Sequence, residues 1–571
     1  MTLPIPVQPF APFVEQGAVS EGDALLARHI AQVGGESDDD VVLAVALCLA
    51  ELRRGAVCVL LDAPAPLEPT VGGHGPQWPQ PAAWRARLAA SPLVRTDGQP
   101  QDRPLRLVGD RLYLQRYWQD EQTIRAVIDA PEGPPYAADE DVAAAVATMF
   151  AGDRAPSSAQ LEAAAVAARS RVTLLAGGPG TGKTWTVAHI LGVLAEVHGG
   201  ELRVAVAAPT GKAATRLQEA IANERPAAAP AWIAGLKPST IHRLLGRRAG
   251  SHETFRFNRD NPLPHDVVIV DEMSMVSLPL MARLLEAVGP GTRLILVGDP
   301  DQLASVEAGA VFGDLVRMRA GREGLVTLRE NHRFTGNLQI LAEAVRSGDV
   351  AGAMAGIAAG GNVEFVESGD GRAAFDAIRQ DVVAQAVALD RAARAGEVAQ
   401  SLAALDAFRL LCAHRHGPHG VWRWSRLIDE WSAAATGREL DGDPWYVGRP
   451  LLVTRNDYAL RIFNGETGVV VGSVTGGDAV AVIDQGDAKT EYPVTQLGDV
   501  ETLHAMTVHK AQGSQYRKVT VVLPPAGSPL LTRELLYTAI TRAQEGVRIV
   551  GTEDAVRAAV GRGVRRASGL A

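Results

Sequence analysis

The chain has 571 residues, too many for one hydrophobic core, so its length predicts three or four domains. The composition, 47% hydrophobic and 21% charged, is ordinary for a globular protein and argues against a disordered chain. No apolar run reaches the length of a membrane span, and the start MTLPIPVQPF lacks a basic segment, so we expect a cytoplasmic protein without membrane contact. The cysteines have no paired metal-ligand spacing and are expected to be small buried side chains: Cys48, Cys58 and Cys412.

The negative charge is concentrated in residues 1–150. They hold 20 of the 65 Asp and Glu residues but only 11 of the 56 Lys and Arg residues, which accounts for the whole net charge of −9. Phosphate contacts need clustered Lys and Arg, so we expect nucleic acid to bind the remainder of the chain. The segment also holds Trp78, Trp84 and Trp118. Aromatic anchors and steering charge favour docking on another protein, against the alternative of an acidic domain that only packs on its neighbour.

Local patterns within and after this segment predict a mainly helical N-terminal domain. DDDVVLAVALCLAELRRG (38–55) is a helical stretch with three acids at its start, where the helix dipole favours them. LRLVGDRLYLQRYW (105–118) is strand-like with a Gly-Asp turn. AGDRAPSSAQ (151–160) is typical of a linker into a new domain.

From residue 171 onward, apolar strands alternate with helices, which predicts an α/β fold with parallel sheets and crossover helices. The strands are VTLLAG, RVAVAAP, DVVIVDE and TRLILVGD, and later FRLLCA (408–413) and KVTVVLP (518–524). Between the last two, residues 444–483 form a run of short strands with Asn-Gly and Gly-Gly turns. This run predicts a small β-barrel inserted in a second α/β domain.

A nucleotide site is predicted by GGPGTGKT (177–184), which fits G-x-x-x-x-G-K-[ST] between a strand and a helix. Its glycines let backbone N–H groups approach phosphates, Lys183 supplies a charge to the β- and γ-phosphates, and Thr184 offers a hydroxyl to Mg²⁺. The expected ATP-binding residues are Gly177, Gly178, Pro179, Gly180, Thr181, Gly182, Lys183 and Thr184.

Two later strands end in polar residues that complete such a site. After VVIV, Asp271 is expected to hold Mg²⁺ through water, and Glu272 to orient or deprotonate the attacking water. Gln302, after the strand LILVGD, is expected to sense the γ-phosphate and this water. The acid next to the water favours hydrolysis over phosphoryl transfer.

Eight motifs in order resemble those of superfamily-one helicases of the RecD type. They are GGPGTGKT, APTGKAATRL (208–217), TIHRLLG (240–246), VVIVDEMSMV (267–276), LVGDPDQLASVEAGAVFGD (296–314), LRENHRF (328–334), TVHKAQGSQY (507–516) and LLYTAITRA (535–543). RLYLQRYW also resembles the RecD N-terminal domain, which extends the likeness to nearly the whole chain. The resemblance implies two RecA-like motor domains, 151–340 and 341–571, with an SH3-like insertion at about 445–503, after a docking domain at 1–150.

The resemblance also implies roles for single residues. Gln160 resembles the glutamine that contacts adenine, and Gln512 and Gly513 fall at the nucleotide. Arg333 and Arg542 resemble two arginines that reach the γ-phosphate from the second motor domain, where a planar permanent charge stabilises the transferring group when the cleft closes. Lys183, Glu272, Gln302, Arg333 and Arg542 are thus the expected catalytic set.

The DNA track is implied by the same likeness. Thr210, His242, Thr507 and His509 resemble residues that line a single-strand groove, where hydroxyls and backbone N–H groups contact phosphates. GRRAGSHETFRFNRDNPLPHD (246–266) resembles a strand-separating wedge hairpin, and FNGETG (463–468) marks the SH3-like module. Two positions depart from the pattern: Gln515 stands where many relatives have Glu near the ribose, and Pro300 replaces an Arg.

The family implies an ATP-dependent 5′→3′ DNA helicase that acts on single-stranded DNA and duplex ends with RecB- and RecC-type subunits in double-strand-break repair and recombination. No residues here resemble a nuclease site, so nuclease activity is assigned to a partner. Three alternatives stay open: a stand-alone RecD-like helicase, a P-loop phosphotransferase or regulatory ATP-binding subunit, and a structural subunit with a decayed ATP site. The first is expected to carry helix–hairpin–helix motifs, which residues 1–150 lack; the second leaves TVHKAQGSQY unexplained.

Overall fold

The computed structural model describes residues 10–64, 76–97, 102–130, 137–152, 155–199, 202–246, 254–333, 336–368, 371–440, 442–457, 459–472, 478–486, 488–564 and 566–570. In this part of the chain, no helix combines the length and the apolar character that crossing a membrane requires. The three cysteines are buried, as predicted.

The N-terminal part is a helical layer on a small sheet of order β1-β4-β3-β2. Its elements are α1 (Ala11–Glu15), α2 (Glu21–Gly34), α3 (Asp39–Arg53), β1 (Cys58–Leu60), α4 (Pro81–Ala90), β2 (Val94–Arg95), β3 (Leu105–Val108), β4 (Arg111–Leu114) and α5 (Gln115–Ile128). The predicted helix is α3, which the Asp38 side chain caps by accepting from the Asp40 N–H at 2.9 Å. β3 and β4 form the predicted hairpin, but the strand does not continue to Trp118, because α5 begins at Gln115.

The tryptophans of this part pack inward. Trp84 is fully buried and its indole N–H donates to the Asp40 carbonyl at 2.8 Å. Trp78 is half-buried and stacks on Trp84, and Trp118 lies under the Arg106 guanidinium. Trp84 is therefore part of the domain core and cannot be an exposed docking anchor, whereas Trp78 and Trp118 remain partly exposed and Trp118 lines a cavity described below. The prediction that this domain docks on another protein stays a prediction. Exposed apolar side chains lie instead on α2, at Leu25, Leu26 and Val33.

The next part is a six-stranded parallel sheet of order β10-β5-β9-β8-β6-β7 with helices on both faces. The strands are β5 (Val172–Gly177), β6 (Val204–Ala208), β7 (Ser239–Thr240), β8 (Val267–Val270), β9 (Arg293–Gly298) and β10 (Leu325–Leu328). The helices are α6 (Asp139–Met149), α7 (Ser158–Arg169), α8 (Lys183–His198), α9 (Gly211–Glu224), α10 (Ile241–Leu244), α11 (Leu278–Ala287) and α12 (Val311–Met318). The central strands are continuous apolar runs because both faces of the sheet are covered. We call this part the first α/β unit.

A second parallel sheet, of order β11-β20-β19-β12-β18, forms the second α/β unit. Its strands are β11 (Val363–Glu367), β12 (Phe408–Cys412), β18 (Ala505–Thr507), β19 (Tyr516–Val522) and β20 (Ala543–Gly551). Its helices are α13 (Asn337–Ser347), α14 (Val350–Ala358), α15 (Gly371–Arg394), α16 (Val398–Asp406), α17 (Val421–Thr436), α18 (Arg533–Ile540) and α19 (Glu553–Gly561). The prediction of an α/β fold with parallel sheets is confirmed.

An antiparallel sheet of order β16-β15-β14-β13-β17 is inserted between α17 and β18. It consists of β13 (Pro450–Val453), β14 (Thr467–Val471), β15 (Val480–Gln485), β16 (Ala488–Pro493) and β17 (Val500–Thr502), around its own apolar core. The predicted run of short strands at 444–483 supplies the first three.

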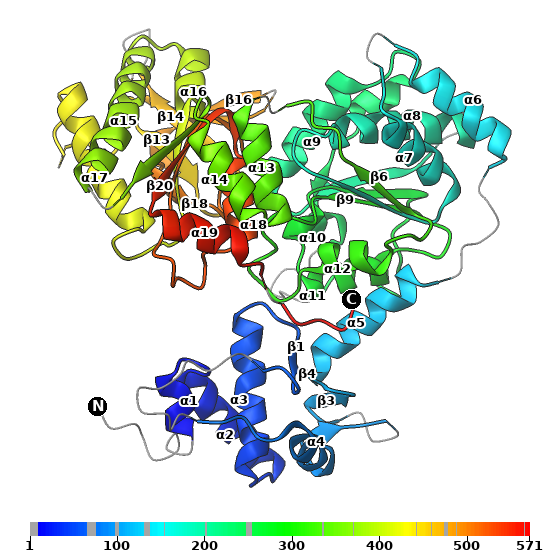
Figure 1. The fold of residues 1–571 in the computed structure, drawn as a ribbon. Helices are drawn as coiled ribbons and strands as arrows, with labels where there is room; N and C mark the ends of the chain where they lie inside the picture. The colour runs from blue at the N-terminus through cyan, green and yellow to red at the C-terminus, as the bar shows by residue number, and fades with distance from the viewer. Residues whose placement is uncertain are drawn as a thin grey trace.

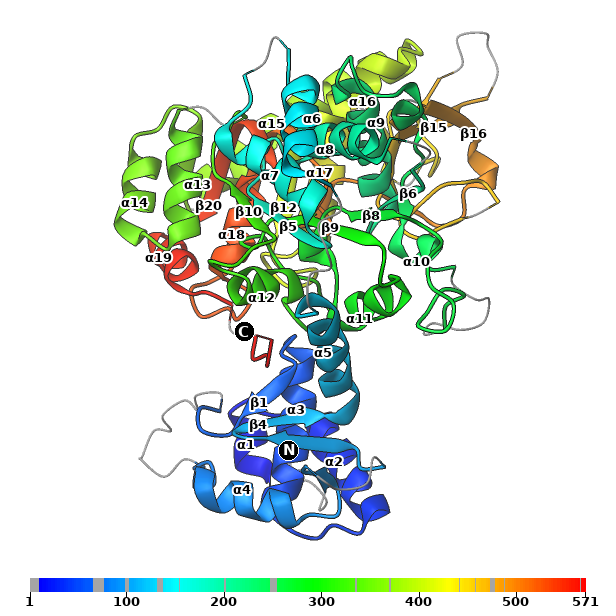
Figure 2. The same ribbon diagram turned by 90° about the vertical axis from the view of Figure 1, so that its right-hand side faces the viewer.

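The two α/β units lie side by side above the N-terminal part (Figures 1 and 2). α5 packs against α11, and Arg283 pairs with Asp120 at 2.8 Å. After α19 the chain returns to this junction, where the Ala567 carbonyl accepts from the N–H groups of Val57 and Cys58 at 2.8 and 3.3 Å. The apolar core of the first unit therefore continues into the N-terminal part, through Tyr113 and Ile124 among others.

Candidate nucleotide and nucleic-acid site

The P-loop turns from β5 into α8. Gly180 and Gly182 have φ of +83° and +80°, in the left-handed region that glycine adopts without steric cost. A Cβ at Gly177 would lie 2.7 Å from the Thr181 hydroxyl and 3.1 Å from the Leu328 carbonyl, so the close packing of the loop also requires glycine there.

α8 begins at Lys183, and the partial positive charge of its N-terminus faces the loop. The Lys183 ammonium donates to the Gly177 and Gly178 carbonyls at 2.7 and 2.9 Å. Thr184 follows it in the first turn of α8.

Two acids follow β8. Asp271 is buried, and one of its carboxyl oxygens accepts from the Glu272 N–H at 2.7 Å. Burial, with the neighbouring Glu272 charge, raises the pKa of Asp271 to about 7, while Lys183 opposes the shift. Glu272 has φ of +54°, a left-handed conformation that costs a non-glycine residue about 1–2 kcal/mol. Such strain occurs at functional sites, where the surrounding fold imposes it.

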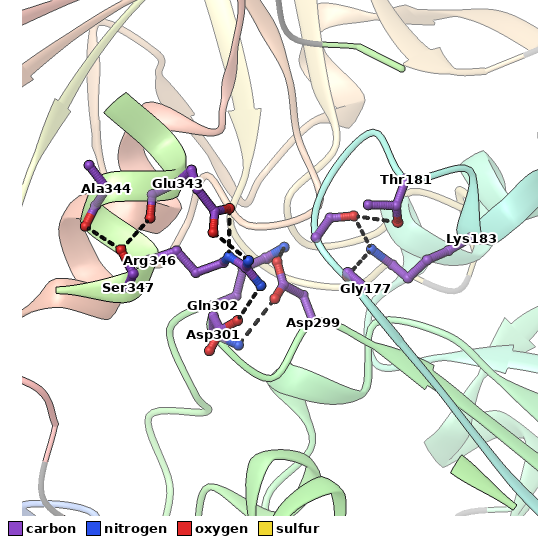
Figure 3. A network of polar contacts seen from close by, with 11 residues as sticks. Gly177, Thr181, Lys183, Asp299, Asp301, Gln302, Glu343, Ala344, Arg346 and Ser347 are labelled. Carbon is purple, nitrogen blue, oxygen red and sulfur yellow. Dashed lines mark hydrogen bonds and ion pairs between the residues drawn. The ribbon is translucent and has the colours of Figure 1, made fainter. Parts of the chain in front are cut away.

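Gln302 lies at the end of β9 in a short polar network (Figure 3). Its amide N–H donates to buried Asp299 at 2.9 Å, while its buried amide oxygen has no partner among the described residues. Figure 3 shows Asp299 between Gln302 and the P-loop with Lys183, and Arg346 of the second unit on the opposite side. Arg346 is paired with Glu343 at 2.7 Å. The Tyr537 hydroxyl of α18 packs against the P-loop, because a Cβ at Gly178 would lie 2.9 Å from it.

Three arginines converge on this space. Arg542 is fully buried and donates to the carbonyls of Thr538 and Ser514 at 3.1 and 3.3 Å. Arg333 is mostly buried, and burial, with the charges of Arg542 and Arg216, lowers its pKa to about 10. Burial likewise lowers the pKa of Arg542, while Glu272 and Asp299 oppose the shift. Neither Arg333 nor Arg542 forms an ion pair within the described part of the chain. Uncompensated buried cations of this kind are suited to an anion.

Hydrogen bonds join the loops that carry these groups, both within the first unit and between the two units. The P-loop touches the loop after β10: the Gly180 carbonyl accepts from the His332 N–H at 2.9 Å, and Asn331 donates to the Pro179 carbonyl at 2.8 Å. The Leu303 carbonyl accepts from Gln512 at 2.5 Å. Arg216 donates to the Gly513 carbonyl at 2.5 Å. The first and second units thus meet at the expected nucleotide residues.

The structure adds detail to two other predicted positions. Gln160 is buried, caps α7 by accepting from the Ser157 N–H at 3.0 Å, and donates to the Thr181 carbonyl at 3.4 Å. Gln515 accepts from two guanidinium nitrogens of Arg333 at 2.5 and 3.1 Å when its amide is oriented to satisfy both groups. Gln515 therefore contacts Arg333, one of the two predicted γ-phosphate arginines.

A cavity of about 1780 Å³ runs between the two α/β units and the N-terminal part. All four predicted DNA-contacting residues line it: Thr210, His242, Thr507 and His509. The hydroxyl of Thr210 accepts from the Ala213 N–H and that of Thr507 from the Lys510 N–H, both at 3.2 Å, so each keeps its own O–H to donate. Of the predicted wedge, residues 247–253 lie outside the described residues, while Phe255 and Arg259 line the cavity.

Sequence reasoning missed four residues of the site: Asp299, Tyr537, Arg216 and Asn331. Asp299 and Tyr537 stand within motifs that were recognised, so their place in those motifs was an available signal. Arg216 and Asn331 also stand within recognised motifs, APTGKAATRL and LRENHRF, but their partners are backbone carbonyls of other loops, which the motifs alone do not identify.

Three family models match the chain: an AAA domain at residues 160–308, the N-terminal domain of RecBCD enzyme subunit RecD at 15–113, and a UvrD-like helicase C-terminal domain at 502–550. RecBCD enzyme subunit RecD of Mycolicibacterium smegmatis is 49% identical over 557 residues, which cover 96% of each chain. The same subunit of Haemophilus influenzae is 30% identical, over 85% of this chain and 84% of that protein. An ATP-dependent RecD2 DNA helicase of Deinococcus radiodurans is 34% identical, over 69% of this chain and 48% of that protein.

The nucleotide site and these matches define an ATP-dependent DNA helicase. Within that class, the chain belongs to the RecD family.

Proposed function

We propose that the chain is the 5′→3′ motor subunit of a RecBCD-type helicase–nuclease, which works with RecB- and RecC-type subunits at DNA ends in double-strand-break repair and recombination. The observation that carries the motor role is the convergence of Arg333 and Arg542 on the P-loop and Glu272. The two units then close on a nucleotide, and the shared cavity beneath them holds the single strand.

The proposed domains follow the three sheets. Both α/β units are RecA-like motor domains, the first up to about residue 340 and the second at 341–571, and the antiparallel sheet at about 445–503 is the SH3-like module. α6 packs against α7 and α8, so we place the start of the first motor domain between Ile128 and Asp139 rather than at 151. Residues 246–266 are proposed as the wedge.

The nucleotide chemistry follows from the site. ATP phosphates bind the N–H groups of residues 177–184 and the Lys183 charge, with Gln160 at the adenine and Gln512 and Gly513 at the cleft. Glu272 accepts a proton from the attacking water, and the unpartnered oxygen of Gln302 accepts a hydrogen bond from the same water. Arg333 and Arg542 stabilise the charge on the transferring phosphoryl group.

A Mg²⁺ ion fits this donor set. Thr184 and Asp271 offer a hydroxyl and a buried carboxylate, the oxygen ligands that Mg²⁺ prefers, and this ion is usually held by few protein ligands together with phosphates. When bound, it neutralises charge that develops on the β- and γ-phosphates. Asp271 holds it through water, and Lys183 adds the second positive charge.

Translocation follows from closure. Leu303 and Gln512 contact each other across the units, and Thr210 and Thr507 line the cavity from opposite units. Closing on ATP shortens the distance between the two threonine contacts, and opening after hydrolysis restores it, so each cycle moves the strand.

The subunit role is favoured over a stand-alone helicase by residues 15–113, which match the RecD N-terminal domain model. The test is an unwinding assay with duplexes that carry either a 5′ or a 3′ overhang, with the chain alone and with RecB- and RecC-type subunits. We expect ATP-dependent entry at the 5′ overhang and co-purification with both subunits. A preference for the 3′ overhang, or failure to assemble, contradicts the respective part of the proposal.

A further inference from the structure

Helix α5 presents three different faces to its surroundings. Ile124 and Ile128 are fully buried in the core shared with the first α/β unit. Glu121 accepts from Ser568 and from the Gly569 N–H, both at 2.9 Å, and so holds the C-terminal segment. The remaining face carries Arg116, Gln119 and Gln122, spaced one helical turn apart and exposed.

This third face lines the same cavity as the predicted DNA-contacting residues. Arg116, Gln119, Gln122 and Thr123 are all part of the cavity wall, opposite contributions from both α/β units. The wall carries six Lys and Arg side chains against three Asp and Glu, and two of these acids, Asp120 and Glu286, are paired with Arg283. Two of the basic side chains, Arg53 and Lys510, pair with acids outside the wall, Asp23 and Glu501. The wall therefore has a net excess of basic side chains, although the N-terminal part as a whole is acidic.

We propose that α5 is the third wall of the single-strand groove, and that Arg116, Gln119 and Gln122 contact the DNA backbone beyond the motor domains. The proposal rests on the motor function proposed above. Residues 1–150 are acidic overall, and from this charge we expected no DNA contact there. The proposal nevertheless places α5 at the DNA, because the charge of the local surface that faces the strand matters more than the net charge of the domain.

The side-chain chemistry suits this occupant. Arg116 offers a planar donor for a phosphate, and the two amides donate to phosphate or sugar oxygens without base specificity. A polar stripe on a helix is usually a solvated surface, but this stripe lines a cavity of about 1780 Å³, larger than a typical small-molecule pocket. The cavity is large, and its wall runs from the α5 stripe to Thr507 and His509. Both features favour an extended polymer as the ligand.

The test compares R116A/Q119A/Q122A with R379A/Q380A/Q400A in the full chain. The second variant removes the same residue types from exposed positions on α15 and α16, away from the cavity. Binding of oligothymidylates of increasing length is measured by fluorescence anisotropy over a salt series. We expect the first variant to weaken binding of long strands by about tenfold and to reduce the salt slope by about 0.7, one phosphate contact. Short strands that fill only the motor groove should bind both variants alike.

Ultraviolet crosslinking of oligothymidylate to the unaltered chain, followed by peptide mapping, supplies a readout independent of the substitutions. Crosslinks within residues 115–128 support the proposal. The α5 proposal alone is overturned if R116A/Q119A/Q122A binds strands of every length with unchanged affinity and salt slope while T507A/H509A binds them more weakly. Loss of partner assembly without a change in DNA binding assigns the stripe to a protein and also overturns it. A wild-type chain that binds no single strand instead refutes the proposed function.

Discussion

The backbone N–H of Leu303 donates a hydrogen bond of 2.8 Å to the hydroxyl of Thr538, across the cleft between the α/β units. Leu303 directly follows Gln302. Thr538 lies one turn before Arg542 and accepts a hydrogen bond from its guanidinium at 3.1 Å. Thr538, a single buried residue of the second unit, therefore links the residue that follows Gln302 to Arg542.

Thr538→Val should lower the DNA-stimulated ATPase rate, because it leaves the buried Leu303 N–H without a partner. The free energy of unfolding should fall by about 1–3 kcal/mol. Thr538→Ser keeps the hydroxyl and is the matched control, with near-normal turnover. Equal ATPase rates for the Val and Ser variants would show that this hydrogen bond does not couple the units.

Lys183→Gln should abolish ATP turnover and translocation, since the phosphates lose a charge that the backbone cannot replace. We expect a fall of several orders of magnitude in kcat/KM. Lys183 bonds only to carbonyls of its own loop, so circular dichroism and thermal unfolding should stay close to wild type. A folded variant with near-normal ATPase activity would refute the assignment.

Glu272→Gln should keep ATP binding and block hydrolysis, because the amide retains the size of the side chain but cannot accept the proton. The variant should accumulate as a closed complex with ATP and DNA. Equilibrium binding of a fluorescent ATP analogue and single-turnover hydrolysis separate the two steps. Loss of nucleotide binding would assign Glu272 a different role.

Arg333→Ala and Arg542→Ala should lower kcat far more than ATP affinity, since both arginines act on the transition state. Arg333→Ala relieves repulsion with Arg216 and Arg542, so the nucleotide-free protein should lose little stability. Arg542→Ala also removes hydrogen bonds from a buried side chain to the Thr538 and Ser514 carbonyls, so its free energy of unfolding should fall by about 1–3 kcal/mol. Steady-state kinetics and thermal unfolding measure the two effects. A change in KM alone would contradict the transition-state role.

Leu26→Asp/Val33→Asp should prevent assembly with RecB- and RecC-type subunits while DNA-stimulated ATPase activity persists. These apolar side chains are 48% and 77% exposed on α2, and we propose that they contact a partner subunit. Ile340→Asp/Val387→Asp introduces the same charges at exposed apolar positions of the second unit and is the control. Deleting residues 1–150 is a poorer test, because it would expose the core that Tyr113 and Ile124 share with the first unit. Full co-purification of the α2 variant would refute the surface.

The sequence predicts the P-loop turn and the strands that precede the predicted nucleotide residues, because each is a short segment with strict geometry. A P-loop needs its glycines and lysine at fixed spacing, and the acids Asp271 and Glu272 must follow a buried strand. The strands β5, β6, β8 and β9 are likewise apolar runs that local pattern alone identifies. Such features depend on neighbours in the chain.

Features that depend on tertiary contact were not predictable. Trp84 donates its indole N–H to the Asp40 carbonyl and lies in the domain core. From the sequence, the tryptophans of this acidic domain were expected to contact a partner protein. In the sequence, the polar stripe of Arg116, Gln119 and Gln122 on α5 looks like any solvated helix face. Only the fold shows that it lines the cavity. The net charge of residues 1–150 does not describe the cavity wall, because Asp120 is the only acid of that segment among the described residues that line it.

The most direct test of the motor assignment is the ATP hydrolysis rate of the full chain with and without oligothymidylate. We expect oligothymidylate to stimulate hydrolysis strongly, because DNA binding aligns the two units on the nucleotide. The stimulation should be lost in both Lys183→Gln and Arg542→Ala. Hydrolysis at the same rate with and without DNA, in a chain that binds both ligands, would contradict the motor assignment.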